Sequence, residues 1–168
     1  GRTVAAALAL KGPWGTRTRV LVVDDGSDDA TPDVLDGLDD LALHTLYRDL
    51  PDARQDRSEA LNAAYRYIRD RTAAELGDPR RVAVGVLGSD SLSSTNMLTA
   101  VSHAMRDPCV GAVQSRIRIH NRDRILAAAQ DLEFGCAAES SQSVRHALSG
   151  NGLFARVVSY TWVLIASY

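Results

Sequence analysis

The chain has too few cysteines for a fold that is held together by disulfide bonds. Its 168 residues include only Cys109 and Cys136, and two cysteines supply neither a disulfide framework nor a four-ligand zinc site. We therefore expect two reduced thiols and a reducing compartment.

Long hydrophobic runs and an excess of one charge are also missing. The longest apolar run, residues 157–168, is broken by Ser159 and Thr161, and it falls short of the roughly 20 residues that span a bilayer as a helix. Lys and Arg number 19 against 21 Asp and Glu, so the formal net charge is -2. This balance provides no basic field for DNA or RNA, and we expect no nucleic-acid partner.

The rest of the composition is that of a globular protein. Hydrophobic residues make up 45% and charged residues 24% of the chain, which excludes the disordered, collagen-like and coiled-coil classes. A chain of 168 residues can bury the core of one domain. Because it begins with Gly1 rather than Met, we expect it to be a piece of a longer protein.

Strand-like and helix-like segments alternate along the chain. Residues 19–23 (RVLVV) form an apolar run without polar alternation, which predicts a strand buried on both faces. Further strands are expected at 41–47, 82–87 and 110–119, and helices at 4–8, after 31–32, at 57–76, around 97–105 and at 123–148. Alternation of this kind predicts right-handed crossovers and a mainly parallel sheet, and hence an α/β fold.

Two helices carry local signals. Thr31-Pro32 predicts an N-cap followed by proline at the first helical position. In the helix 57–76, apolar spacing predicts that one face is buried. The residues expected on that face are Leu61, Ala64, Tyr65 and Ile68.

Acidic residues follow two of the expected strands. Asp24 and Asp25 end the strand 19–23, and Asp90 follows the strand 82–87. Sites in parallel sheets gather at the carboxyl ends of the strands, where carboxylates can accept hydrogen bonds from a base N–H or a ribose hydroxyl. The alternatives are an acidic helix-cap region favoured by the helix dipole for the first pair, and a plain turn residue for Asp90.

The segment VVDDGSDDAT, residues 22–31, resembles the signature of family 2 glycosyltransferases. Six further segments resemble the family's motifs and follow in the family's order. They are PDARQDRSEALNA at 51–63, VGVLGSDSLSSTNML at 84–98, DPCVGAVQ at 107–114, RIHNR at 118–122, QDLEF at 130–134 and GNGLFAR at 150–156. Order and spacing together carry the resemblance.

The resemblance implies a GT-A fold, which is a three-layer α/β fold with a mainly parallel sheet and helices on both faces, here incomplete. It covers residues 1–156 as a partial nucleotide-sugar-binding domain and leaves 157–168 as an atypical apolar tail. The chain begins in the helix that follows the family's first strand, and that strand lies between those matching 19–23 and 82–87. We therefore expect a gap in the centre of the sheet, flanked by unpaired backbone groups.

The apolar tail is rich in residue types that favour strands. We expect it to pair with an exposed sheet edge. A helix and an aggregation-prone segment are the alternatives.

The resemblance also assigns nucleotide-binding residues. It places Asp25 at the uridine or an equivalent base, with Asp24 in support. Arg57 stands where the family usually has Lys near the nucleotide, which replaces a point charge by a planar fork; the alternative is a solvated residue of the first helical turn. Asp56 occupies a position that is usually Gly, and we expect it to stiffen or reshape that loop.

The implied metal site departs from the family pattern. The family's D-x-D motif holds a divalent cation on the donor diphosphate, and this chain has Gly88-Ser89-Asp90 there. Mg²⁺ is often held by one or two carboxylates with phosphates and waters, so we expect Asp90 to form a weak Mg²⁺ or Mn²⁺ site. Residues 150–152 (Gly150, Asn151 and Gly152) are expected to shape an acceptor-side loop, or to be only a turn.

The function that the resemblance implies is binding of a nucleotide-sugar donor, a UDP-sugar, for inverting transfer to a polysaccharide or glycolipid acceptor. This is hexosyltransferase chemistry, and it needs a carboxylate to take the acceptor's proton. No residue of the chain matches that carboxylate, so the catalytic residue is unknown and we expect the isolated chain to bind nucleotide weakly without transferring sugar.

Other functional classes stay open. One is a non-catalytic nucleotide-binding fragment or relic. Another is a Mg²⁺-dependent phosphotransfer enzyme built on Asp24 and Asp25, against which the lack of a P-loop argues. Family members commonly carry flanking transmembrane helices, so we expect the full-length protein at the cytoplasmic face of the cell membrane.

Overall fold

The computed structural model describes residues 1–13, 16–76, 81–107, 109–113, 126, 128–129, 131–132 and 160–166. The chain divides into two compact units. The first combines Gly1–His103 with Arg156–Tyr168, and the second is Ala104–Ala155. The sheet and the candidate site belong to the first unit.

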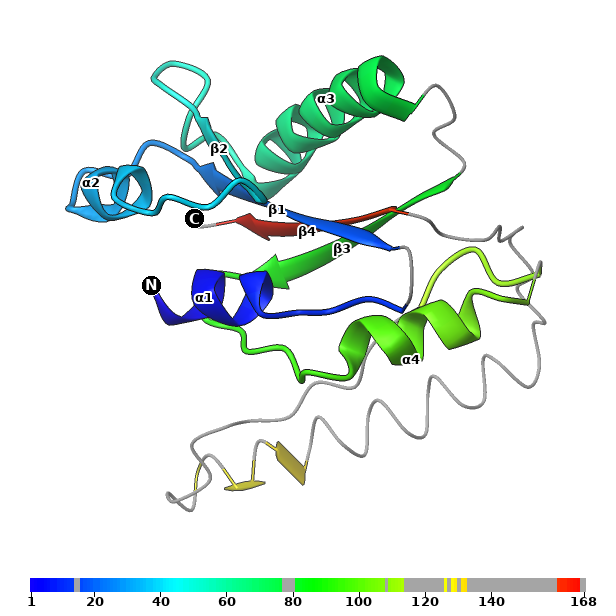
Figure 1. Cartoon of the computed structure of the whole chain (residues 1–168). Coiled ribbons are helices and arrows are strands. Elements are labelled where there is room, and N and C mark those ends of the chain that lie inside the picture. The colour runs from blue at the N-terminus through cyan, green and yellow to red at the C-terminus, as the bar shows by residue number, and fades with distance from the viewer. Residues whose placement is uncertain are drawn as a thin grey trace. The chain divides into compact units, whose positions relative to one another are not determined.

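The first unit contains a four-stranded sheet in which every pairing is parallel (Figure 1). The strand order is β2-β1-β4-β3. The strands are β1 (Arg17–Asp24), β2 (Leu43–Tyr47), β3 (Val82–Gly88) and β4 (Tyr160–Ala166), and the helices are α1 (Arg2–Leu8), α2 (Thr31–Asp36), α3 (Arg57–Leu76) and α4 (Met97–Ala104). The predicted α/β fold with a parallel sheet is confirmed.

The last strand in the sequence lies in the middle of the sheet. β4 runs parallel to β1 on one side, with Val20 opposite Val163, and parallel to β3 on the other, with Gly85 opposite Val163. The expectation of a central gap is therefore wrong, because Tyr160–Ala166 supplies backbone partners to both neighbouring strands. The tail does form a strand, but it is inserted between two strands and does not extend an outer edge.

Helices cover both faces of the sheet because β1 alternates its buried side chains between them. Val20 and Val22 belong to one core cluster, and Leu21 and Val23 belong to the other. The first cluster contains Val4, Ala7 and Leu10 of the α1 segment with Leu35 and Leu98, and the second contains Ala60, Ala64 and Ile68 of α3. Three layers result, with α1 and α3 on opposite faces (Figure 1).

Helix α3 has the predicted bounds and most of the predicted buried face. Ala64 and Ile68 are buried together with Ala60, and Leu61 packs against the same cluster, whereas the Tyr65 side chain is 63% exposed. Residues four apart lie on one stripe of a helix, and two alanines on that stripe let the helix approach β1 closely. Tyr65 is one residue further round the helix, so the prediction that it is buried is wrong.

Two other local predictions also need correction. Helix α2 has Ala30 as its N-cap, so Thr31 is the first helical residue. Residues 110–113 form no strand, because the Asp107 side chain accepts a hydrogen bond from the Cys109 amide and its carbonyl accepts one from the Val110 amide, which turns the chain. The rest of the predicted strand 110–119 and most of the predicted helix 123–148 lie outside the described residues.

His44 of β2 contacts Tyr67 of α3, and its surroundings disfavour the protonated ring. Its Nδ1 lies 3.0 Å from the Tyr67 hydroxyl. Burial lowers the pKa of His44 below 6.5, and the positive charges of Arg19 and Arg71 lower it further, against a smaller opposite effect of Glu75. The folded state therefore binds fewer protons than the unfolded state around this pH.

We expect the free energy of unfolding to decrease as the pH falls below about 6.5, because the unfolded chain then takes up the proton that the folded chain resists. Urea unfolding between pH 5 and pH 8 measures this dependence. His44→Asn should flatten the curve in this range, and an unchanged slope in that variant would show that another group is responsible.

Candidate functional site

The predicted site residues lie at one edge of the sheet. Val23 of β1 and Gly88 of β3 are both paired with Ala166 of β4, so the two strands end at the same level. Adjacent strands are about 4.8 Å apart, which puts the ends of β1 and β3 about 10 Å apart. Asp24, Asp25 and Asp90 are therefore brought to the same carboxyl edge, as the sequence predicts.

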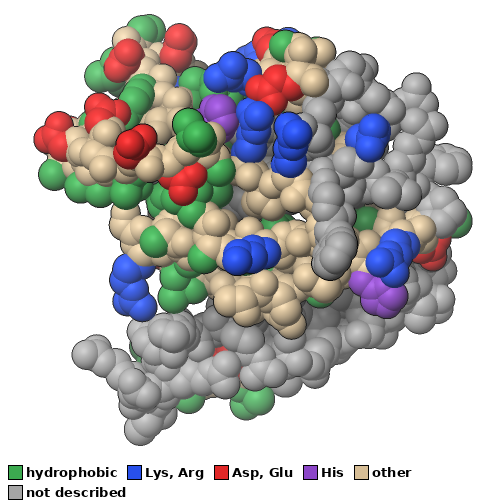
Figure 2. Space-filling model, in the orientation of Figure 1, with side chains coloured by type: hydrophobic (Ala, Val, Ile, Leu, Met, Phe, Trp, Pro, Cys, Tyr) green, Lys and Arg blue, Asp and Glu red, His purple; other side chains and the backbone are tan. Residues whose placement is uncertain are grey.

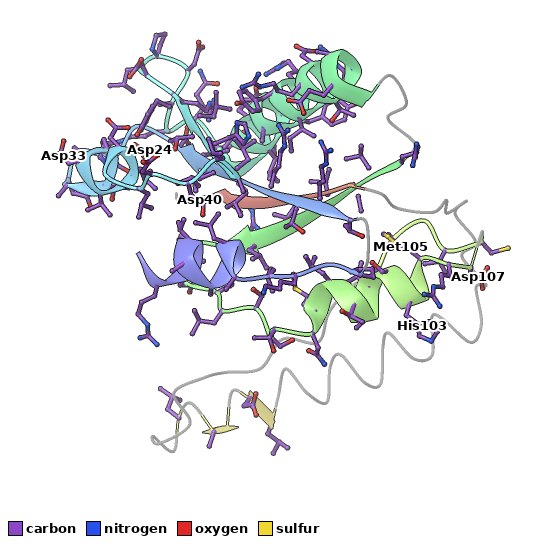
Figure 3. All side chains as sticks on the ribbon, in the orientation of Figure 1. Asp24, Asp33, Asp40, His103, Met105 and Asp107 are labelled. Carbon is purple, nitrogen blue, oxygen red and sulfur yellow. The ribbon has the colours of Figure 1, made fainter. Side chains whose placement is uncertain are left out.

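Asp24 closes the turn that follows β1. It is 2% exposed, and its Oδ1 accepts hydrogen bonds from the Ser27 amide at 3.0 Å and from the Ser27 hydroxyl. Figure 3 shows Asp24 at the end of β1, next to α2. Its contribution to the edge is to fix the backbone of the turn in which Asp25 stands.

Asp25 forms a buried ion pair with Arg48. The Arg48 Nη1 donates a hydrogen bond to Asp25 Oδ1, and the two side chains are only 8% and 5% exposed. Arg48 directly follows β2 and was not expected from the sequence as a site residue. Within the described part of the chain, Asp25 Oδ2 has no hydrogen-bond donor. It can therefore accept a hydrogen bond from a ligand N–H group.

A second arginine, Arg54, fastens the same two loops together. Its Nε donates to the Gly26 carbonyl at 2.9 Å, and its Nη2 lies 3.0 Å from Asp28 Oδ2 and lowers the pKa of that carboxyl. Arg54 itself has a φ of 60°, an uncommon conformation for a residue with a side chain. Gly26 has a φ of 80°, and a Cβ there would lie 3.0 Å from the Cβ of Ala53, so this turn requires glycine.

The start of α3 is set by Asp56. Its Oδ1 accepts a hydrogen bond from the Glu59 amide at 2.9 Å, and the amides of Glu59 and Ser58 lower the pKa of Asp56. This is an N-cap contact. Asp56, at a position where the family usually has Gly, therefore ends the loop and begins α3. Arg57 is the first residue of α3 and is exposed.

Asp90 stands in a turn that directly follows β3. The Ser91 amide donates to the Gly88 carbonyl at 3.0 Å, and the Thr3 hydroxyl of α1 donates to the Ser89 carbonyl at 2.6 Å. A Cβ on Gly88 would lie 3.0 Å from Asp90 Oδ1. A side chain at position 88 would therefore face the carboxylate of Asp90.

The described residues contain no group of three His, Cys, Asp or Glu side chains that could hold a metal ion. Asp90 is exposed and offers one carboxylate at its turn. A cation there would need oxygen ligands from a bound molecule and from water, which is a common arrangement for Mg²⁺.

Acidic side chains gather on and around α2, beside the carboxyl edge of the sheet. Figure 2 shows them gathered over this part of the first unit. The exposed members are Asp28, Asp29, Asp33, Asp36, Asp39 and Asp40. Such a surface repels a bare anion, so a phosphate group bound here would benefit from a cation.

A cavity of ≈ 450 Å³ is lined by the loop after β2 and by α3, including Arg48, Gln55 and Glu59. Arg48 therefore lines this cavity and also contacts Asp25.

One predicted part of the site lies outside the described residues, and two arginines and one helix cap were not predicted. The acceptor-side loop Gly150, Asn151 and Gly152 lies outside the described residues. Sequence reasoning missed Arg48 and Arg54, although Arg48 directly follows a predicted strand and so stands at the carboxyl edge. It also missed the cap, for which Asp56 followed three residues later by Glu59 is a known signal.

Three comparisons with known proteins bear on this site. The family model described as Glycosyl transferase family 2 matches residues 1–157. Neither the curated proteins nor the solved structures gave a match. Separately, among the described residues we found no helix with the length and apolar character of a membrane span.

Proposed function

Because the chain belongs to glycosyl transferase family 2, we propose that it binds the nucleotide half of a UDP-sugar at the carboxyl edge of the sheet. Family membership supports a glycosyltransferase-like function. The proposal extends this to inverting transfer of a hexose to a polysaccharide or glycolipid acceptor, by a full-length protein at the cytoplasmic face of the cell membrane.

The state of Asp25 carries the proposal. Among the described residues, Arg48 donates to Oδ1 of this almost fully buried carboxylate, which leaves Oδ2 as the acceptor for a ligand. Uracil has a ring N–H that can donate to the remaining oxygen. Asp24 supports this contact by fixing the turn, and Arg57 adds a positive charge at the start of α3.

The phosphates of the donor are proposed to lie towards Asp90. A leaving nucleoside diphosphate gathers negative charge, and a divalent cation such as Mg²⁺ or Mn²⁺ neutralises it when bound. Asp90 fits this role as a single carboxylate ligand completed by phosphate and water oxygens. With one carboxylate, the cation site is expected to be weak without a nucleotide.

Calorimetric titration of UDP, with and without Mn²⁺, tests the proposal. We expect binding that Mn²⁺ strengthens, and an affinity for UDP about 10- to 100-fold lower in Asp25→Asn, which is the effect of losing a hydrogen bond to a charged group. Asp28→Asn is the matched control, because its side chain is 85% exposed. A wild-type chain that binds no UDP in either condition contradicts the proposal.

Gly88→Asp should strengthen the cation site. The new carboxylate would start from a Cβ that faces Asp90 Oδ1 at 3.0 Å, so two carboxylates would share one cation. We expect a Mn²⁺ affinity at least about 10-fold higher in the presence of UDP, measured by the same titration.

Gly88→Ala controls for the added Cβ. It should leave the Mn²⁺ affinity no higher than in the wild type, because it introduces the same steric contact without a ligand. Equal gains in both variants would show that the added carboxylate is not a ligand, which contradicts a cation shared with Asp90.

A non-catalytic nucleotide-binding role is the second candidate, and the glycine at position 88 favours it. The two candidates differ in turnover by the full-length protein. Metal-dependent consumption of a UDP-sugar by that protein supports the transferase, whereas UDP binding without consumption supports the binding role.

A further inference from the structure

We propose that Arg48 is a positioning residue, which orients the carboxylate of Asp25 for contact with the nucleobase. This inference rests on the proposed function, since it assumes that Asp25 is the group that contacts the base. It concerns a residue that neither the sequence motifs nor the family match assigns.

Arg48 makes contacts in three directions at the carboxyl edge. Its amide donates to the Asp24 carbonyl at 2.9 Å, which continues the pairing of β2 with β1 beyond the strands. Its Nη1 donates to Asp25 Oδ1, and its Nη2 donates to the Asp52 carbonyl. The guanidinium is therefore held by the loop after β2 while it holds the carboxylate.

The planar fork of the guanidinium makes this contact directional. Nη1 and Nη2 are fixed relative to each other, so a guanidinium bonded to the Asp52 carbonyl presents Nη1 to Asp25 from one direction. Asp25 Oδ1 is thereby engaged, and the free acceptor capacity is left on Oδ2. A lysine could supply the charge at Asp25 but could not provide both donors in this geometry.

Neighbouring contacts keep this arrangement rigid before a ligand binds. Arg54 attaches the same loop to Gly26, and the Cβ of Ala53, which is 2% exposed, lies 3.0 Å from the position that a Cβ of Gly26 would take. The side chains of Arg48 and Asp25 are 8% and 5% exposed, so neither can swing into solvent without leaving the packed edge. A preformed carboxylate costs the ligand less ordering free energy on binding.

The test is a double-mutant cycle with Arg48→Met, Asp25→Asn and the double variant. The UDP affinity of each variant is measured by calorimetry in the presence of Mn²⁺. We expect Arg48→Met to lower the UDP affinity about 10- to 100-fold in the wild-type background. In the Asp25→Asn background the same change should cost less than about 2-fold, because Arg48 then has no carboxylate to orient. Arg69→Met is the control, as Arg69 is exposed and pairs with Asp70.

Arg48→Lys keeps the test decisive if Arg48→Met does not fold. It retains a cation beside Asp25 and loses the second donor, so we expect an intermediate loss of about 3- to 10-fold. Equal losses for Arg48→Met in the two backgrounds would mean a general structural role and overturn the inference, as would wild-type affinity in Arg48→Lys. If the wild-type chain binds no UDP, the proposed function fails and the inference fails with it.

Discussion

Asp25→Ala is expected to lower the free energy of unfolding by about 3–5 kcal/mol, because it leaves the buried guanidinium of Arg48 without its counter-charge. The cost comes from the unpaired charge more than from the lost attraction. It is a large fraction of the 5–15 kcal/mol that typically stabilises a domain, and it should shift the unfolding transition clearly.

Urea unfolding followed by circular dichroism measures this change. The double variant Asp25→Ala with Arg48→Met should recover a substantial part of the loss, since it removes both charges from the buried site. Asp28→Ala is the matched control. Asp28 pairs with Arg54 at an exposed position, and surface pairs contribute little, so its unfolding curve should stay close to that of the wild type. A double variant less stable than Asp25→Ala would contradict the buried-pair explanation.

Val163→Pro is expected to destabilise the sheet by at least about 1–3 kcal/mol, because a buried carbonyl in the centre of the sheet loses its donor. Val163 lies in the middle of β4, opposite Val20 on one side and Gly85 on the other. Proline lacks the amide donor and is almost absent from central strands. Both β1 and β3 pair with β4 along its length. A local disruption of β4 should therefore weaken more than one hydrogen bond of the sheet.

Val163→Ala separates the backbone effect from the side-chain effect at this position. It keeps the amide, so it should retain the sheet, whereas Val163→Pro should expose the amides of β1 and β3 to solvent. Hydrogen exchange with peptide-level resolution measures this difference. Protection of β1 and β3 in the proline variant equal to that of the wild type would show that β4 is not their partner.

Local patterns in the sequence determined most of the elements around the site. The apolar run at 19–23 and the helix at 57–76 correspond to β1 and α3, since their patterns depend on residues close in the chain. The common edge of Asp25 and Asp90 also followed from the sequence, because parallel strands end at one side. The family resemblance found at the level of motifs agrees with the match over residues 1–157.

Partners distant in the sequence were beyond such reasoning. Asp25 and Arg48 are 23 residues apart in the sequence and follow different strands. They come together only when β2 pairs with β1 in its particular register. The same holds for Arg54, whose contact with Gly26 depends on a positive φ that its sequence gives no reason to expect. The burial of α3 was predicted from apolar character, while the fit of two alanines against β1 decided it.

The sequence by itself determined an α/β chain with two acidic strand ends and the motifs of family 2 glycosyltransferases. Only the tertiary structure decided that Tyr160–Ala166, the last strand in the chain, fills the centre of the sheet, where a gap was expected. The reason is that the residue types of an apolar segment indicate a strand but do not indicate which strands it pairs with. The position of β4 depends on the backbone donors and acceptors of β1 and β3, which would be unpaired without it.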